Sequence, residues 1–141
     1  MLCLLAHVPE TVETGLHLNR TLHSFFRSGS SHRLRIAINL KGLTYEYNPV
    51  DLRRNEHQSA RYKALNPRGF VPTLEIDGQV LIQSPAILEW LEERYPSPAL
   101  LPADSSDRAR VRAIAAIIGR DIHPLNNRRI LEYLRGTLHC D

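Results

Sequence analysis

Residues 71–84 have the sequence VPTLEIDGQVLIQS, which carries the clearest structural signals in the chain. Two short apolar runs flank Asp77-Gly78, a dipeptide that favours the tight two-residue turn of an antiparallel hairpin. Ser84 and Pro85 follow the second run, and these residue types favour the N-cap and the first turn of a helix. The stretch therefore predicts a β-hairpin that leads directly into a helix with Ser84 as its N-cap.

Upstream of the hairpin, strand-like and helix-like segments alternate. Residues 22–26 (LHSFF) predict a short strand, and residues 43–50 (LTYEYNPV) alternate between apolar and polar side chains as a second strand would. Between them, apolar residues at helical spacing predict a helix over 33–41 that stops at Gly42. A weaker, more polar helical pattern covers residues 55–67.

The expected order is therefore strand, helix, strand, helix, strand, strand, helix. A right-handed βαβ unit followed by a hairpin and a helix is the thioredoxin-like arrangement, so residues 21–95 are assigned to an α/β domain of that type. Within its first helix, we expect Leu34, Ile36 and Leu40 to anchor the helix to the sheet.

Beyond this domain the sequence changes character. Residues 96–106 are rich in Pro and Ser and are expected to form a linker. Apolar residues then recur at helical spacing within 107–141, with an interruption at Pro124, which predicts the first helix or helix pair of an all-helical second domain. We expect that domain to be incomplete in this chain, and residues 1–20 to be an extension outside the fold.

Composition excludes several classes of protein. Apolar residues make up 43% and charged residues 23%, which are proportions of a globular protein and not of a disordered one. The net charge is only +3, the arginines are dispersed and aromatic residues make up 6%, so no nucleic-acid partner is expected. No apolar run approaches the roughly 18 residues of a membrane span, and the amino-terminal apolar run lacks the basic flank of a signal peptide. We therefore expect a cytoplasmic protein without a membrane partner.

Serines gather at residues 28–31, where the first predicted strand passes into the first predicted helix. A serine hydroxyl and the positive end of a helix both stabilise a thiolate. The two cysteines, Cys3 and Cys140, lie near the chain ends, so a thiol at this place would have to belong to a ligand. The alternative is a set of helix-capping serines with no ligand. Because no Cys or His residues have the spacing of metal ligands, no metal site is expected.

Two further places could bind a peptide-like ligand. A cis bond at Val71-Pro72 would turn the N–H and C=O groups of Val71 outward, where they could pair with an extended peptide. A trans bond at a strand edge is the alternative. Gln83 and Ser84 precede the last predicted helix of the α/β domain, and the free N–H groups of a helix start attract a carboxylate. Ser84 could cap that helix and share the cap with a ligand.

Residues 121–134 (DIHPLNNRRILEYL) contain a group of polar and basic side chains. His123 and Asn127 are four residues apart and would share one face of a helix. The adjacent Arg128 and Arg129, together with Arg27, could clamp a small dicarboxylate. The alternative is a solvated polar face without a ligand.

The sequence resembles the zeta class of glutathione transferases in six segments: FRSGSSHRLRIA, KALNP, VPTL, IQSPAILEWLE, YPSPALLP and DIHPLNNRRILEYL. The resemblance covers residues 22–135 in unbroken register. It is strongest to the branch of bacterial maleylpyruvate isomerases, with the maleylacetoacetate isomerases next. It implies a thioredoxin-like domain that binds glutathione, a helical domain that binds most of the substrate, and a homodimer where the fold is complete.

The resemblance also implies roles for individual residues. Arg27, Arg128 and Arg129 would hold substrate carboxylates and part of the peptide. His123 and Asn127 would form the opposite side of the site. The residues expected to bind glutathione are Ser28, Gly29, Ser30, Ser31, His32, Arg33, His57, Val71, Gln83, Ser84, His123, Asn127, Arg128 and Arg129, and those expected in catalysis are Ser28, Ser30 and Arg27.

The activity that the resemblance implies is glutathione-dependent cis–trans isomerisation of maleylpyruvate to fumarylpyruvate, or of maleylacetoacetate to fumarylacetoacetate, in the catabolism of aromatic compounds. The common zeta motif Ser-Ser-Cys is Ser28-Gly29-Ser30 here, which leaves Ser28 as the first candidate to stabilise the thiolate and Ser30 as the second. General glutathione transfer, dehalogenation of α-haloacids and a non-catalytic glutathione-binding fragment are the alternatives.

Overall fold

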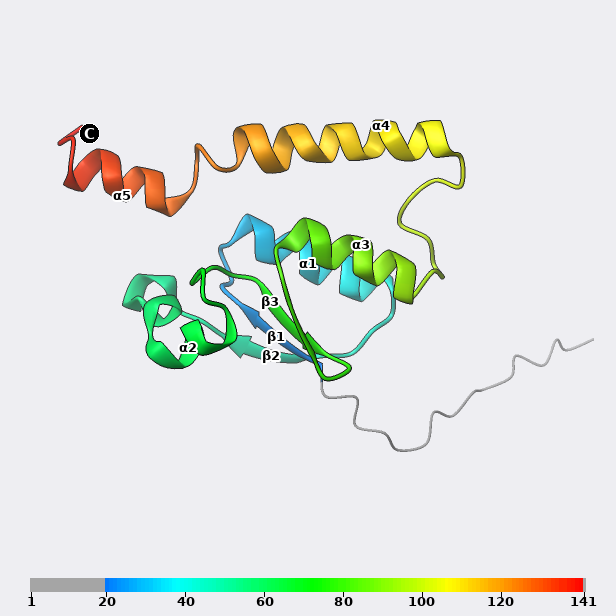
Figure 1. The fold of residues 1–141 in the computed structure, drawn as a ribbon, viewed down its shortest axis with the longest axis horizontal. Helices are drawn as coiled ribbons and strands as arrows, with labels where there is room; N and C mark the ends of the chain where they lie inside the picture. Colours follow the sequence, from blue (N-terminus) through cyan, green and yellow to red (C-terminus); the bar gives the residue numbers. More distant parts are fainter. Residues whose placement is uncertain (1–19, 141) are drawn as a thin grey trace, which may run out of the picture.

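The computed structural model describes residues 20–140, and its centre is a four-stranded mixed sheet with the order β2-β1-β3-β4 (Figure 1). The predicted extension over 1–20 lies outside the described residues, except for Arg20. The predicted α/β arrangement is confirmed, because the first two strands are parallel and the last two form an antiparallel hairpin. The strands are β1 (Thr21–Ser24), β2 (Glu46–Pro49), β3 (Thr73–Ile76) and β4 (Gln79–Ile82).

The β3–β4 hairpin has the geometry that its turn residues predict. Asp77 and Gly78 have φ angles of 52° and 74°, the left-handed conformations that a two-residue hairpin turn requires at both central positions. Thr73 pairs with Ile82, and Ile76 pairs with Gln79, so the register closes directly on the turn.

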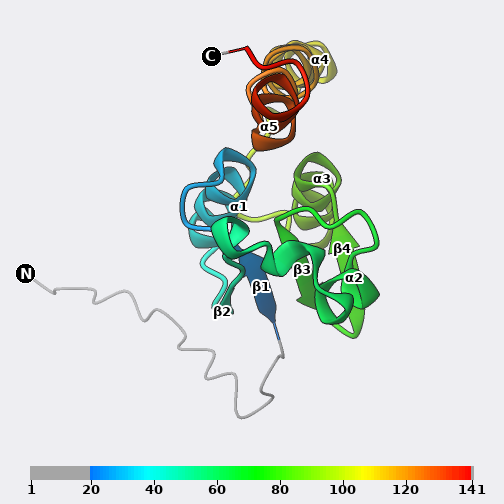
Figure 2. The same ribbon diagram turned by 90° about the vertical axis from the view of Figure 1, so that its left-hand side faces the viewer.

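Helices α1 (Gly29–Leu40) and α3 (Ser84–Arg94) lie side by side on one face of the sheet (Figure 2). Helix α2 (Ala60–Leu65) lies on the opposite face of the sheet, where the hydroxyl oxygen of Tyr62 is 2.9 Å from that of Thr73. Thr73 can reach this face because successive residues of a strand point to opposite faces of the sheet. Two short 3₁₀ turns, Leu52–Arg54 and Glu56–Gln58, precede α2, so the helix predicted over 55–67 is shorter than expected. The apolar core under α1 and α3 consists of Leu22, Leu34, Ile38, Leu74, Ile76, Ile87 and Leu91.

Helix α1 begins four residues before the predicted start at residue 33, because Ser28 caps it. The Ser28 hydroxyl accepts the backbone N–H of Ser31 at 3.2 Å. At the other end, Gly42 has φ 67°, and the N–H groups of Gly42 and Leu43 donate to the carbonyls of Asn39 and Ile38. This pair of bonds satisfies carbonyls that the helix end would leave free, and it confirms Gly42 as the stop.

The prediction that Ile36 and Leu40 anchor α1 to the sheet is wrong. Both side chains are about half exposed, whereas Leu34, Ala37 and Ile38 are buried. A helix turns by about 100° per residue, so the residues that share a face with Leu34 are three and four positions further along, not two or six. An apolar residue type alone did not identify the buried face.

The carboxyl-terminal segment lies beyond α1 and α3 as a separate layer of helix (Figure 1). Helix α4 (Ser105–Ala116) begins inside the predicted linker 96–106, because Asp104 accepts the N–H groups of Ser106 and Asp107. It continues into the π-helical turn η3 (Ile117–Ile122), and α5 (Arg128–Gly136) follows a turn that contains Pro124. Within these three described elements no residue is buried, and no helix of residues 20–140 is long and apolar enough to cross a membrane.

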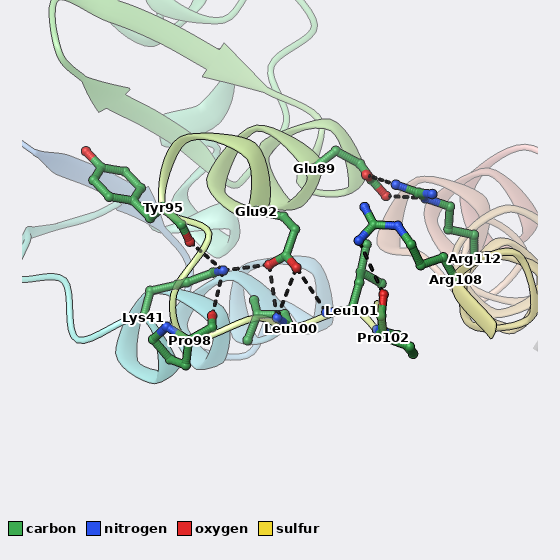
Figure 3. Close-up of polar contacts among 10 residues, drawn as sticks. All are labelled: Lys41, Glu89, Glu92, Tyr95, Pro98, Leu100, Leu101, Pro102, Arg108 and Arg112. Carbon is green, nitrogen blue, oxygen red and sulfur yellow. Dashed lines mark hydrogen bonds and ion pairs between the residues drawn. The ribbon is translucent and has the colours of Figure 1, made fainter. Parts of the chain in front are cut away.

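A buried ion pair joins α1, α3 and the connection between α3 and α4 (Figure 3). The Lys41 ammonium, at the end of α1, donates to the Glu92 carboxylate at 2.5 Å and to the carbonyls of Tyr95 and Pro98. The Glu92 carboxylate also accepts the backbone N–H groups of Leu100 and Leu101. Burial would raise the pKa of the Glu92 carboxyl, but the bonds from Lys41, Leu100 and Leu101 together lower it below its ordinary value. No pattern in the sequence indicates this pair.

Replacing Lys41 by Met is expected to lower the free energy of unfolding by about 3–5 kcal/mol, because it leaves a buried carboxylate without its cation. Urea unfolding measures this loss. Arg94→Gln is the control, since Arg94 lies 3.8 Å from Asp77 in an exposed pair and should change stability by less than about 0.5 kcal/mol. Similar small losses for both variants would show that the buried pair contributes no more than a surface one.

Candidate functional site

The amino end of α1 is the centre of the candidate site. The oxygen of Ser28 is used as the helix cap, which leaves its hydroxyl proton free for another acceptor. Ser30 lies on the first turn, with its hydroxyl 3.1 Å from Nε2 of His123. Ser31 is fully buried, and its hydroxyl has no hydrogen-bond partner within residues 20–140. The serine cluster therefore offers both used and unused hydroxyl groups at the positive end of a helix.

His123 links this helix start to the carboxyl-terminal segment. Burial and the nearby positive charge of Arg33 on α1 lower the pKa of its imidazole. The ring is therefore mostly neutral at neutral pH, with one nitrogen able to donate and the other able to accept. If Nε2 of His123 is protonated, it donates to the Ser30 oxygen and leaves the Ser30 hydroxyl proton free. If Nε2 is not protonated, the Ser30 hydroxyl donates its proton to His123.

The prediction that His123 and Asn127 share a helix face is wrong. His123 is the C-cap of η3. Asn127 is the N-cap of α5, with extended backbone angles and a side chain that accepts the N–H of Ile130 at 3.3 Å. Pro124 lies between them and has no N–H to continue a helix, and asparagine favours the cap position. The i, i+4 rule therefore does not apply across this turn.

The three candidate arginines lie in two places. Arg128 and Arg129 occupy the first two positions of α5, whereas Arg27 is exposed on the turn before α1. Arg128 pairs with Glu132 and donates to the side-chain oxygen of Asn55. Among the described residues no acidic group forms an ion pair with Arg27 or Arg129, so their charges are available to an anion. The structure does not join these arginines into a single clamp.

Two residues that the sequence did not single out support this region. Asn55, in a left-handed conformation between the two 3₁₀ turns, receives the bond from Arg128. The ring of Phe70 lies under the guanidinium groups of Arg68 at 5.5 Å and Arg129 at 6.0 Å. The Asn55–Arg128 and Phe70–Arg129 contacts connect residues distant in sequence, and no local pattern marks them.

His57 lies in the second 3₁₀ turn. Burial lowers the pKa of its imidazole, and the charge of Arg128 lowers it further. Its Nδ1 atom is buried with no partner within residues 20–140. Gly69 packs directly against this turn, because a Cβ atom at Gly69 would lie 2.8 Å from the His57 carbonyl oxygen. His57 is thus a half-buried group with unused hydrogen-bonding capacity.

Val71-Pro72 is a cis peptide bond, which decides between the cis and trans alternatives that the sequence left open. Neither the N–H nor the C=O of Val71 has a hydrogen-bond partner in the part of the chain that the structure describes. Phe70, the preceding residue, is held by its carbonyl, which accepts the Tyr62 hydroxyl at 2.7 Å and the Asn66 amide at 2.8 Å. The strand start is therefore fixed while the Val71 backbone groups remain free.

The prediction that Ser84 is the N-cap of α3 is wrong by one residue. Gln83 occupies the cap with φ 69°, and its carbonyl accepts the N–H of Ile87, so Ser84 is the first helical residue and is buried. The chain bends at Gln83 on leaving β4, which starts the helix earlier than the residue types suggest. Of the remaining candidates, Gly29 packs near the His123 ring, and His32 is exposed on α1. No cluster of metal-ligating side chains occurs in residues 20–140.

Comparison with known proteins identifies related sequences and structures. A match to the family described as "Glutathione S-transferase, N-terminal domain" covers residues 27–94. A maleylpyruvate isomerase from Ralstonia sp. is 66% identical over 120 residues, which are 85% of this chain and 57% of that protein. The chain therefore spans little more than half the length of this curated relative.

Solved structures show the same relationship. A structure described as the holo form of maleyl pyruvate isomerase, a bacterial zeta-class glutathione S-transferase, matches with a TM-score of 0.84 and 65% identity over 86% of this chain and 57% of that one. A maleylacetoacetate isomerase from Methylobacterium extorquens AM1, with bound malonate and GSH, matches with a TM-score of 0.83 and 38% identity over the same shares.

Gly69→Ala is expected to lower the free energy of unfolding by about 2–3 kcal/mol, because it combines an unfavourable backbone conformation with a backbone clash. Gly69 has φ 61°, and its Cβ would lie 2.8 Å from the His57 oxygen. The control Gly78→Ala has φ 74° but open space around the Cβ and should cost only about 1–2 kcal/mol. Equal losses in urea unfolding would contradict the close packing of Gly69 on His57.

Proposed function

We propose a function for this chain from its membership of the glutathione transferase family and its similarity to the zeta class of that family. It binds glutathione and uses it for the cis–trans isomerisation of maleylpyruvate to fumarylpyruvate or of maleylacetoacetate to fumarylacetoacetate. The observation that carries the proposal is the amino end of α1, where hydroxyl groups gather and no cysteine is present. A nucleophilic thiol for this site therefore has to come from a bound molecule.

The residues present fit glutathione. The free N–H and C=O of Val71 suit the backbone of a short extended peptide. The start of α3 at Gln83 and Ser84 suits a carboxylate. The unpartnered Nδ1 of His57 offers a further polar group. The proposed glutathione-binding residues of the α/β domain are Ser28, Gly29, Ser30, Ser31, His32, Arg33, His57, Val71, Gln83 and Ser84.

Bound glutathione would supply a thiolate that adds reversibly to the activated cis double bond of the substrate. Ser28 is the first candidate to stabilise that thiolate, because its oxygen already accepts the Ser31 N–H and its proton is free to donate. Ser30 is the second, because it shares one hydrogen bond with His123. The helix start adds a partial positive charge behind both hydroxyls.

The arginines supply the charge that a dicarboxylate substrate needs. Arg27 and Arg129 form no ion pair among the described residues, so neither has to leave an acidic partner to bind a carboxylate. Arg128 stays paired with Glu132 and Asn55 and supports the start of α5. The malonate bound with GSH in the M. extorquens isomerase supports a dicarboxylate as the ligand class.

We also propose a cytoplasmic homodimer that acts in the catabolism of aromatic compounds. The exposed apolar side chains of the carboxyl-terminal segment support association with a second copy; they are Val111, Ile114, Ile117, Ile118, Ile122 and Leu125. Covering such a group removes apolar surface from water.

Ser28→Ala is expected to raise the thiol pKa of bound glutathione by about one unit, because a hydrogen bond to the charged form is lost. The ultraviolet absorbance of the thiolate, followed against pH, measures this change. Ser59→Ala is a matched control, since Ser59 caps α2 by accepting the N–H of Tyr62 at 3.2 Å. Both variants should lose about 1 kcal/mol of stability through the cap, but only Ser28→Ala should change the thiol. An unchanged thiol pKa would assign the role to Ser30.

The full chain is expected to convert maleylpyruvate or maleylacetoacetate only when glutathione is present. Arg129→Gln should raise the KM for the substrate by about ten-fold, because one charge-assisted hydrogen bond to a substrate carboxylate is lost. Arg135→Gln, near the far end of the same helix, should leave it unchanged. A folded protein that binds glutathione but shows no glutathione-dependent conversion would contradict the proposed activity, and faster turnover of an α-haloacid would favour the transferase alternative.

A further inference from the structure

We propose that Glu89 and Glu92 of α3 are positioning residues that hold the carboxyl-terminal segment over the amino end of α1 and so maintain the contact between Ser30 and His123. This inference rests on the proposed function, because that contact belongs to the proposed thiol site. Glu92 acts on the connection before α4, and Glu89 acts on α4 itself (Figure 3).

Such residues are needed because the carboxyl-terminal segment lacks buried residues of its own among those described. Helix α4, turn η3 and helix α5 contain no buried residue among those described, so no apolar core fixes their position on the α/β domain. Their apolar side chains, such as Ile114 and Ile118, are more than half exposed. Polar contacts therefore have to supply the placement that apolar packing gives elsewhere in this fold.

Glu92 fixes the course of the connection. Its carboxylate accepts the backbone N–H of Leu101 at 3.1 Å and that of Leu100 at 3.0 Å. Lys41, held by the same carboxylate, donates to the carbonyls of Tyr95 and Pro98, so the beginning and the end of the connection meet at one buried centre. The start of α4 can move little relative to α3 while these bonds are formed.

Glu89 fixes the direction of α4. Its two oxygens accept the Nε and Nη2 groups of Arg112 at 2.9 and 2.5 Å, and the bond lowers the pKa of the Glu89 carboxyl. A planar fork of two parallel bonds restrains orientation as well as distance. Both side chains are about half exposed, so the pair contributes little to global stability. Its effect should therefore be on placement and not on folding.

Helix α4 transmits this restraint to the site. Arg112 and His123 are joined by the end of α4 and by η3 without an intervening loop. At 1.5 Å per residue, this continuous helical segment is about 16 Å long and should move as one rigid unit. At its end, His123 meets Ser30, and Gly119 packs near the guanidinium of Arg33. A small rotation of α4 about its start would separate His123 from Ser30 and Gly119 from Arg33.

The test compares Arg112→Gln and Glu89→Ala with Arg110→Gln in the full chain. Arg110 forms an ion pair with Asp107 inside α4, so it is a matched control that does not bridge to α3. The first readout is the pKa of His123, followed by NMR of its ring protons. Burial and Arg33 hold this pKa below its ordinary value of 6.5, so release of α4 should raise it toward that value in the two bridging variants only.

The second readout is kinetic. The bridging variants should lose about ten-fold in kcat, as expected for a displaced group, with the KM for glutathione unchanged. The exchange Glu89→Arg with Arg112→Glu should restore both readouts. A His123 pKa that stays at its wild-type value in Arg112→Gln, or that the exchange does not restore, overturns the proposal. If the wild type shows no glutathione-dependent turnover, the proposed function fails, but the His123 pKa still decides the positioning role.

Discussion

The ion pair between Lys41 and Glu92 is the constraint on which the arrangement of the elements depends. A buried ammonium is tolerated only when its donors are satisfied, and Lys41 has three acceptors for its three N–H groups. These acceptors come from α3 and from the connection, so the pair forms only when both are in place beside the end of α1. The chain has only two lysines among its 18 basic residues, Lys41 and Lys63. An arginine at position 41 would offer a flat fork of donors, which does not match three acceptors around a single nitrogen.

Local signals predicted the β3–β4 hairpin and the carboxyl end of α1 well. Asp77 and Gly78 determine the hairpin through their own backbone preferences, and Gly42 stops α1 for the same kind of reason. Such features depend on neighbouring residues alone, so they are visible in a sequence. The errors arose where residue type was not enough, because the direction of a side chain or the course of the backbone also mattered. Ile36 and Leu40 are apolar but lie on the wrong side of the helix, and Ser84 favours a cap that Gln83 occupies, because the bend after β4 comes one residue earlier.

The candidate site was predictable in one part and not in the other. The serines at 28–31 are adjacent in sequence, and their hydroxyls gather at the start of α1 through the helix cap itself. The contact of Ser30 with His123 spans 93 residues, and the bond between Arg128 and Asn55 spans 73. The resemblance placed His123 and Arg128 at the site, but only the fold showed which groups they meet. Asn127 illustrates the difference, because the turn at Pro124 converts an expected neighbour of His123 into a helix cap.

The two halves of the proposed site are therefore stabilised in different ways. The amino end of α1 rests on the apolar core, through Leu34 and Ile38, so its hydroxyl groups are placed by the same packing that folds the domain. His123 is placed by a helix that buries none of its own described residues and depends on charged contacts to α3. Charged contacts at a surface weaken with salt, whereas apolar packing is strengthened by many salts. Ionic strength should then act mainly on the side of the site that carries His123, leaving the hydroxyl groups of α1 where the core holds them.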